Sequence, residues 1–165
     1  MNLTPAQVKN LMRRGLRFIV DPEPTKDDKR LVRNHFVNHC AYCGTPIDSN
    51  GGDIDHLVSA ALGGANGLAN RVLSCKLCNA VEKRDRDWLE FLREKAQTPE
   101  IFDHRKRTIE RWVEINGGHL RLDPTLSATL QNEERATTDY YDRACKRIKV
   151  MKSIRVIRRI RGRSS

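Results

Sequence analysis

One short stretch of the chain combines residues suited to two kinds of metal chemistry. Between residues 40 and 79, four cysteines form two Cys-x-x-Cys pairs, and the dipeptide Asp55-His56 lies between the pairs. Asn79 directly follows the last of these cysteines. Thiolates favour zinc, carboxylate and amide oxygens favour magnesium or manganese, and an imidazole is a natural base near neutral pH. The four cysteines therefore predict a sulfur-bound metal, and they leave open what the carboxylate, the imidazole and the amide within the same stretch do.

The sulfur site is predicted from spacing alone. Its members are Cys40, Cys43, Cys75 and Cys78. Each Cys-x-x-Cys turn presents two thiolates to one side, and two turns together complete a tetrahedral site. Such a closed site leaves no position for a reacting water, so we expect a structural Zn²⁺ that fastens the segments carrying it. His39 could substitute as a ligand, although four thiols suffice, and Cys145 is expected to be an unpaired structural thiol.

The residues around Asp55-His56 resemble the HNH, or ββα-metal, endonucleases. The characteristic sequence motif of that family is matched, in order, by Asp55, His56, Gly63, Gly64, Asn70, Cys75, Cys78, Asn79 and Lys83. The preceding Cys40-x-x-Cys43 pair matches the zinc-bearing branch of that family, and the resemblance covers roughly residues 36–92. One departure is Ser59, at a position three residues after the histidine where the family often has proline.

The resemblance implies a role for each residue of the string. His56 would activate a water molecule, and Asp55 and Asn79 would hold a catalytic Mg²⁺ or Mn²⁺. Asn70 would bind backbone groups and hold the loop that orients His56. On a strand, Asp55 and His56 face opposite sides, so Asp55 is not expected to be the partner of the base.

Two cations follow Asn79 by about one helical turn. Lys83 and Arg84 could contact a phosphate group of the substrate, or they could form only a solvated helix face.

The helices and strands expected around these residues indicate an α+β, mostly helical fold. A ββα-metal, treble-clef-like zinc core would carry flanking helices at both ends. The expected parts are an N-terminal helical region (1–35), the nuclease core (36–95), a helical extension (96–140) and a basic tail (141–165).

Local signals predict several boundaries. Thr4-Pro5 and Thr25 with Asp28 are typical helix starts, and Gly15 is a plausible stop. Residues 47–57 suggest strand, turn and strand, and residues 59–70 a loop of small residues. Further helices are expected from Asn79 through Leu92, from Thr98 to Asn116, and after Pro124.

The net charge of +10 and the pI of about 9.7 indicate a polyanionic partner. Ten Lys and Arg residues and one acid fall within residues 141–165, so the rest of the chain is almost neutral. We expect this tail to bind DNA, most simply double-stranded DNA, through residues that include Arg155, Arg158, Arg159 and Arg161. A disordered tail and a helix on an anionic membrane surface are the alternatives.

No secretory signal and no membrane span are evident, and we expect no membrane partner. These features, with the resemblance, favour the cytoplasm of a bacterium or of a phage-infected host.

The function implied by the resemblance is divalent-metal-dependent DNA hydrolysis that leaves 5′-phosphate and 3′-hydroxyl ends. Restriction enzymes and phage nickases are examples of small HNH enzymes of this kind. Cleavage of both DNA strands would favour a homodimer. The alternatives are a non-catalytic zinc-dependent nucleic-acid-binding protein and an RNA-cleaving toxin.

Overall fold

The computed structural model describes the backbone of residues 3–161 and the side chains of residues 3–153. The chain divides into two compact units. The central unit comprises residues 21–123, and the two-helix unit comprises residues 1–20 with 124–165. None of the described helices is long and apolar enough to cross a membrane.

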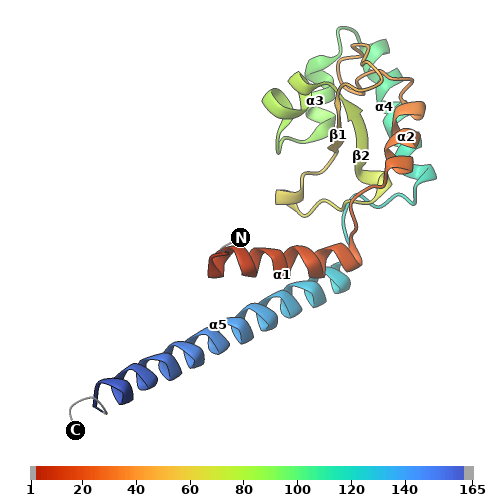
Figure 1. Ribbon diagram of the computed structural model, residues 1–165. Coiled ribbons are helices and arrows are strands. Elements are labelled where there is room, and N and C mark those ends of the chain that lie inside the picture. The colour runs from red at the N-terminus through yellow and green to blue at the C-terminus, as the bar shows by residue number, and fades with distance from the viewer. Residues whose placement is uncertain (1–2, 162–165) are drawn as a thin grey trace. The chain divides into compact units, whose positions relative to one another are not determined.

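A two-stranded antiparallel sheet lies at the centre of the central unit (Figure 1). Strand β1 (Asp53–His56) pairs with β2 (Arg71–Ser74), so that Asp55 lies opposite Val72 and His56 lies opposite Arg71. The α+β, mostly helical fold with a cysteine-rich core is thus as the sequence predicts.

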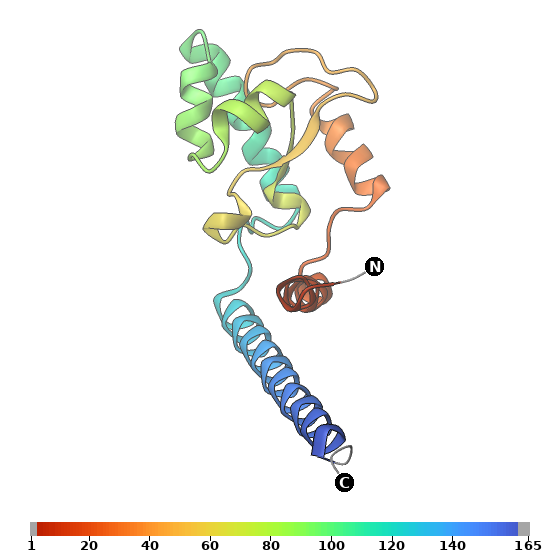
Figure 2. The ribbon, with the colours of Figure 1, turned by 60° about the vertical axis from the view of Figure 1, so that its left-hand side comes forward.

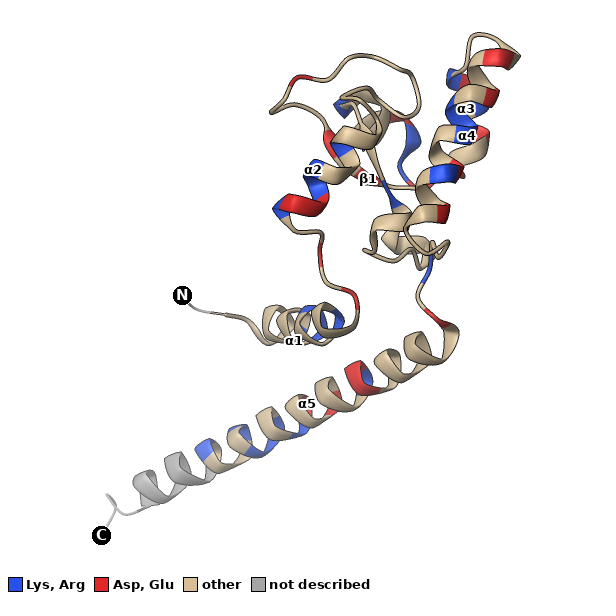
Figure 3. Cartoon of the chain, turned by 90° about the vertical axis from the view of Figure 1, so that its right-hand side faces the viewer, with Lys and Arg blue, Asp and Glu red and all other residues tan. Residues whose placement is uncertain are grey.

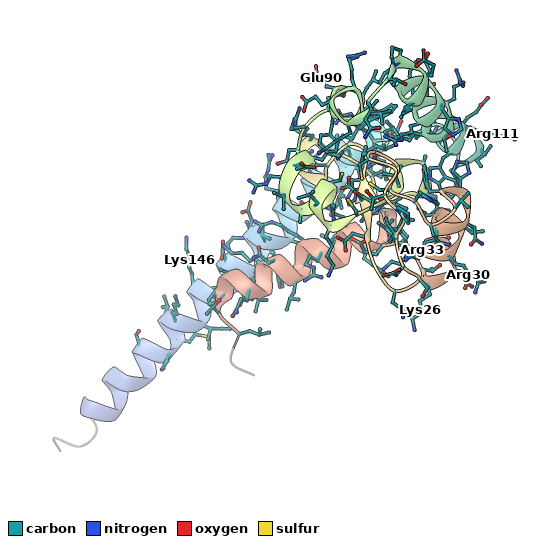
Figure 4. All side chains as sticks on the ribbon, turned by 90° about the horizontal axis from the view of Figure 1, so that it is seen from above. Lys26, Arg30, Arg33, Glu90, Arg111 and Lys146 are labelled. Atoms are coloured by element: carbon teal, nitrogen blue, oxygen red, sulfur yellow. The ribbon has the colours of Figure 1, made fainter. Side chains whose placement is uncertain are left out.

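The partner of β1 differs from the expected one. Residues 47–52 form a loop and not a strand that pairs with 53–57, and Figure 2 shows this loop, in orange, beside the sheet. Arg33, which Figure 4 labels, donates hydrogen bonds to the carbonyls of Asp48 (2.5 Å) and Gly51 (2.8 Å). These hydrogen bonds hold the loop 47–52 against the helix that contains Arg33, and β1 pairs with β2 instead of with this loop. Strand β2 is buried at all four positions, so it has no alternating polar pattern that would reveal it.

The segment between the strands contains two short 3₁₀ helices, η1 (Ala60–Leu62) and η2 (Leu68–Asn70). Ser59 precedes η1 with a φ of −62°, which is within the range that proline adopts. The backbone at this position is therefore compatible with the family's usual proline.

The helix expected from Asn79 through Leu92 is two helices. Element η3 (Leu77–Lys83) is a π-helix, and Arg84 ends it with a φ of 46°. The second helix, α3 (Trp88–Lys95), begins where the Asp87 side chain accepts hydrogen bonds from the N–H groups of the next turn. This N-cap explains the restart, because it satisfies donors that would otherwise lack partners.

Two further helices cover the sheet. Helix α2 (Lys26–His35) begins at a Thr25–Asp28 capping box, and α4 (Pro99–Ile115) begins at Thr98. Both starts agree with the sequence signals. Figure 1 shows α2 on the β2 side of the sheet and α3 on the β1 side. Their inner faces and the sheet form one apolar core, whose largest members include Val32, Phe36, Tyr42, Leu57, Leu73, Phe91, Leu92, Ile109 and Trp112.

The two-helix unit consists of α1 (Pro5–Val20) and α5 (Pro124–Arg161). Helix α1 continues through Gly15, where the sequence suggested a stop, and α5 runs unbroken across residue 140. Ion pairs between Lys9 and Asp142 and between Arg17 and Glu134 join the helices. Figure 3 shows Lys and Arg following one another along the later part of α5. The side chains of Arg155, Arg158, Arg159 and Arg161 lie outside the described part.

Candidate metal centre and active site

The four paired cysteines form one cluster. The Sγ atoms of Cys40, Cys43, Cys75 and Cys78 all lie within 4.8 Å of one another. Cys43 and Cys75 Sγ are 3.8 Å apart. A tetrahedral zinc with Zn–S bonds of about 2.3 Å requires sulfur atoms about 3.8 Å apart. The cluster therefore has the donor set and the dimensions of a closed four-thiolate zinc site.

The thiols already interact with one another. Interaction with the Cys78 thiol is the main reason that the pKa of Cys40 falls to about 4. The same interaction raises the pKa of Cys78. A thiolate is thus favoured in the cluster, and a thiolate is the form that binds zinc. Neither His39 nor Cys145 belongs to the cluster, and Cys145 lies on α5 in the other unit.

The cluster joins segments that are far apart in the sequence. Its first pair lies in the turn after α2; of its second pair, Cys75 directly follows β2 and Cys78 lies in the first turn of η3. Asn79 directly follows the last cysteine of the cluster, so the cluster fixes its position. Its backbone N–H donates to the Cys75 carbonyl at 3.0 Å.

His56 is held through both ring nitrogens. Arg71 Nη1 lies 3.2 Å from His56 Nδ1, and Asn66 Oδ1 lies 3.0 Å from Nε2. Because a guanidinium only donates, Nδ1 is the acceptor and the proton is on Nε2. Burial, and after it the positive charge of Arg71, lowers the pKa of His56 below its ordinary value of 6.5. His56 is thus a neutral imidazole whose Nδ1 lone pair accepts a hydrogen bond from Arg71.

Asn70 connects the two sides of the loop between the strands. Its Oδ1 accepts from the Val58 N–H at 2.8 Å, and its Nδ2 donates to the carbonyls of Val58 (2.9 Å) and Ala65 (2.8 Å). Gly64 allows this close approach, since a Cβ there would lie 1.8 Å from the Val58 carbonyl oxygen. The loop that Asn70 spans begins two residues after His56.

Asp55 points into the interior. Its Oδ2 accepts a hydrogen bond from the Tyr42 hydroxyl at 3.1 Å and lies 3.3 Å from Lys83 Nζ. Burial raises the pKa of Asp55, although the charge of Lys83 acts in the opposite direction. Tyr42 is itself fixed by an edge-to-face contact with Phe91, with ring centroids 5.1 Å apart.

Lys83 corrects one expectation from the sequence. It is not on a solvated face of the helix where it could reach a phosphate, because its exposure is 0%. Its ammonium group pairs with Asp55 and donates to the His56 carbonyl at 2.6 Å. Arg84, one residue later, is exposed and remains available as a candidate phosphate contact.

Asn79 contacts a different aspartate from the one that the resemblance assigns to it. Asn79 Nδ2 lies 3.2 Å from Asp53 Oδ2. Asp53 and Asp55 share a face of β1 because they are two residues apart on a strand. The structure therefore joins β1 to η3 by two pairs, Asp53 with Asn79 and Asp55 with Lys83, and it records no contact between Asp55 and Asn79 among the described residues.

An open pocket adjoins the first of these pairs. Its volume is about 460 Å³, and its charged and polar lining includes Glu23, Lys29, Asp53, Arg71 and Asn79. Arg71 Nη2 donates to Glu23 at 3.0 Å, while Nη1 reaches His56. The pocket thus combines hard oxygen donors with a guanidinium bonded to the candidate base.

Three residues of this site were not singled out from the sequence. Asp53 could have been found, because on a strand it must share the face of Asp55. Arg71 and Asn66 had no such signal, since their approach to His56 depends on the pairing of β1 with β2 and on the fold of the loop.

Comparison with known families agrees with the geometry. Residues 40–89 match the family of HNH endonucleases. The matched residues contain β1, β2, η3 and all four clustered cysteines, consistent with a zinc-binding branch of that family. This family supports a nuclease-type hydrolase function for the central unit. No curated protein matches the chain.

Proposed function

We propose that the protein is a divalent-metal-dependent DNA endonuclease with a structural zinc. The observation that carries the proposal is a neutral His56 whose Nδ1 accepts a hydrogen bond from Arg71, an arginine that lines a pocket with hard oxygen donors. The match of this region to HNH endonucleases supports a phosphodiester as the substrate class.

The two proposed metals have separate tasks. Zn²⁺ in the cysteine cluster would hold the turn after α2 against the start of η3, and would take no part in the reaction. Asn79 and a carboxylate of β1 would hold Mg²⁺ or Mn²⁺, which prefer such oxygen ligands. When bound, this ion supplies positive charge to the phosphate and the leaving oxygen.

The chain itself would supply the base. In the proposed reaction a phosphate oxygen of DNA replaces Glu23 as the partner of Arg71, and Arg71 turns from His56 towards the phosphate. His56 Nδ1 then takes a proton from water, and the water oxygen forms the new bond to phosphorus. The bond from phosphorus to the 3′ oxygen breaks, and that oxygen takes a proton from solvent water, which leaves 5′-phosphate and 3′-hydroxyl ends, as the family resemblance implies.

Removal of the base provides the test. Supercoiled plasmid is incubated with the protein and Mg²⁺ or Mn²⁺, beside a His56→Ala variant and beside a structured RNA. The native protein is expected to nick or cut the plasmid, and His56→Ala to be about 10²- to 10⁴-fold slower. Cleavage by both proteins at the same rate, or binding of DNA without cleavage in several sequences and metals, would contradict the proposal. Cleavage of RNA alone would indicate the RNA-cleaving alternative.

The biological setting has a test of its own. A restriction enzyme would cleave at a fixed sequence, whereas a nickase would convert supercoiled plasmid to the open circle without linear product. A homodimer, measured by light scattering, is expected only if both strands are cut together.

A further inference from the structure

We propose that Asp53, and not Asp55, is the carboxylate ligand of the catalytic divalent ion, with Asn79 as its partner. This inference rests on the proposed function, and it concerns which side chains of β1 and η3 hold the ion.

Asp55 already forms an ion pair with a cation of the chain, Lys83. Its carboxylate pairs with Lys83 at 3.3 Å and accepts from Tyr42 at 3.1 Å, and its side chain is 10% exposed. A divalent ion on the same carboxylate would lie close to a buried ammonium group, which would repel it. It would also draw Asp55 from Lys83, whose charge would then be buried without its counter-ion.

Asp53 has the opposite surroundings. No cation forms an ion pair with it among the described side chains, and its recorded partner is the Asn79 amide at 3.2 Å. It is partly exposed and lines the open pocket, whereas Asp55 does not. A cation can therefore reach Asp53 from solvent without breaking an interior ion pair.

The Asp53–Asn79 pair has the donors that such an ion requires. The amide NH₂ group of Asn79 now occupies a position beside the carboxylate. Rotation of the amide by half a turn would place its oxygen there instead, which gives two hard oxygen ligands. Water and phosphate oxygens can complete the coordination shell from the pocket.

The same pocket has a place for an anion. Arg71 and Lys29 line it together with Asp53 and Asn79, and Arg71 already binds the exposed carboxylate of Glu23. Glu23 is thus an internal stand-in for a phosphate group, in the same pocket as the proposed ion. This second feature indicates a site for a phosphate–metal pair and not an isolated acidic residue.

Metal binding distinguishes the two aspartates without depending on activity. The zinc-loaded protein is titrated with Mn²⁺, and free Mn²⁺ is measured by electron paramagnetic resonance. Asp53→Asn is expected to weaken Mn²⁺ binding at least tenfold with zinc content and thermal unfolding unchanged. Asp55→Asn is expected to leave Mn²⁺ affinity within about threefold but to lower the unfolding temperature. Asp103→Asn, an exposed change on α4 with the same loss of charge, is the control.

The outcomes separate this inference from the proposed function. Loss of Mn²⁺ binding in Asp55→Asn with retention in Asp53→Asn, or no Mn²⁺ binding by the native protein, would overturn the inference. Plasmid cleavage by the native protein, with Asp53→Asn binding Mn²⁺ normally, would overturn the inference alone. Mn²⁺ binding lost in Asp53→Asn, in a protein that cleaves no nucleic acid, would support Asp53 as the ligand of the divalent ion and overturn its catalytic function.

Discussion

Lys83 Nζ lies 3.3 Å from Asp55 Oδ2 in the interior of the central unit, where Lys83 is fully buried. The pair joins η3 to β1, and Lys83 also donates to the carbonyl of the adjacent His56. An ion pair at this position fixes the strand that carries the candidate base. Its first role is therefore structural, although it occurs within the sequence motif that resembles a catalytic string.

Asp55→Asn is expected to destabilise the protein by about 3 kcal/mol, because it leaves the Lys83 ammonium without its counter-ion in the interior. Combining it with Lys83→Met should recover most of this loss, since the double variant buries no charge. Urea denaturation of the single and double variants measures both effects.

The exposed Lys106–Glu110 pair on α4 is the matched control. Changing Glu110→Gln there should cost about 0.5 kcal/mol or less. A loss below about 1 kcal/mol for Asp55→Asn would mean that the Lys83 ammonium is not confined to the interior as described.

The sequence predicts the parts of this fold that depend on neighbouring residues. The cysteine spacing indicates the cluster because each Cys-x-x-Cys turn fixes two sulfur atoms locally. The same is true of the caps at Thr25 and Thr98, whose partners lie three residues away. These features need no knowledge of the tertiary fold.

The partners of the site residues depend on segments that meet only in the folded chain. Lys83 is 28 residues from Asp55, and it reaches Asp55 because η3 packs against β1. Arg71 reaches His56 because it is the cross-strand neighbour of His56, and the sequence around β2 did not indicate a strand. The motif therefore indicated the region of the candidate site, but not the pairing of its residues or the presence of Asp53, Arg71 and Asn66 in it.

Arg71→Gln is expected to move the acid limb of the pH–rate profile to higher pH. The pKa of His56 lies below 6.5 because of burial first and the Arg71 charge second, so removing that charge raises the pKa. The base works only when unprotonated, so activity is lost as pH falls through the pKa of His56. A higher pKa makes this loss begin at a higher pH.

NMR titration of the His56 ring gives the same comparison without activity. The ring resonances are assigned by their absence in His56→Ala, and the exposed Arg107→Gln change on α4 is the control. A pKa of His56 in Arg71→Gln that is equal to or lower than that of the native protein would contradict the contact between Arg71 and His56.

Cys75→Ser is expected to remove zinc and to disrupt the region around the sheet. The native protein should contain about one zinc per chain, released by a thiol-modifying reagent and measured with a colorimetric chelator. In Cys75→Ser, the near-ultraviolet circular dichroism signal should fall and proteolysis within residues 40–89 should accelerate, because zinc binding contributes to folding. Cys145→Ser changes a thiol outside the cluster, and it should retain both the zinc and the fold. Full zinc content in Cys75→Ser would contradict a four-thiolate site.

Neutralising the described basic residues of α5 should reduce the salt dependence of DNA binding. The variant replaces Arg143, Lys146, Arg147, Lys149 and Lys152 with glutamine. For each phosphate that the variant no longer neutralises, the slope of log K against log salt should fall by about 0.9, because fewer counterions are released on binding. Fluorescence anisotropy of a labelled duplex between low and moderate salt measures this slope.

The paired change Arg107→Gln with Arg111→Gln on α4 serves as the control, and it should have little effect if the tail is the DNA-binding element. An unchanged slope in the α5 variant would mean that the charge of the helix serves another partner, and vesicles containing anionic lipid would then be the next ligand to test.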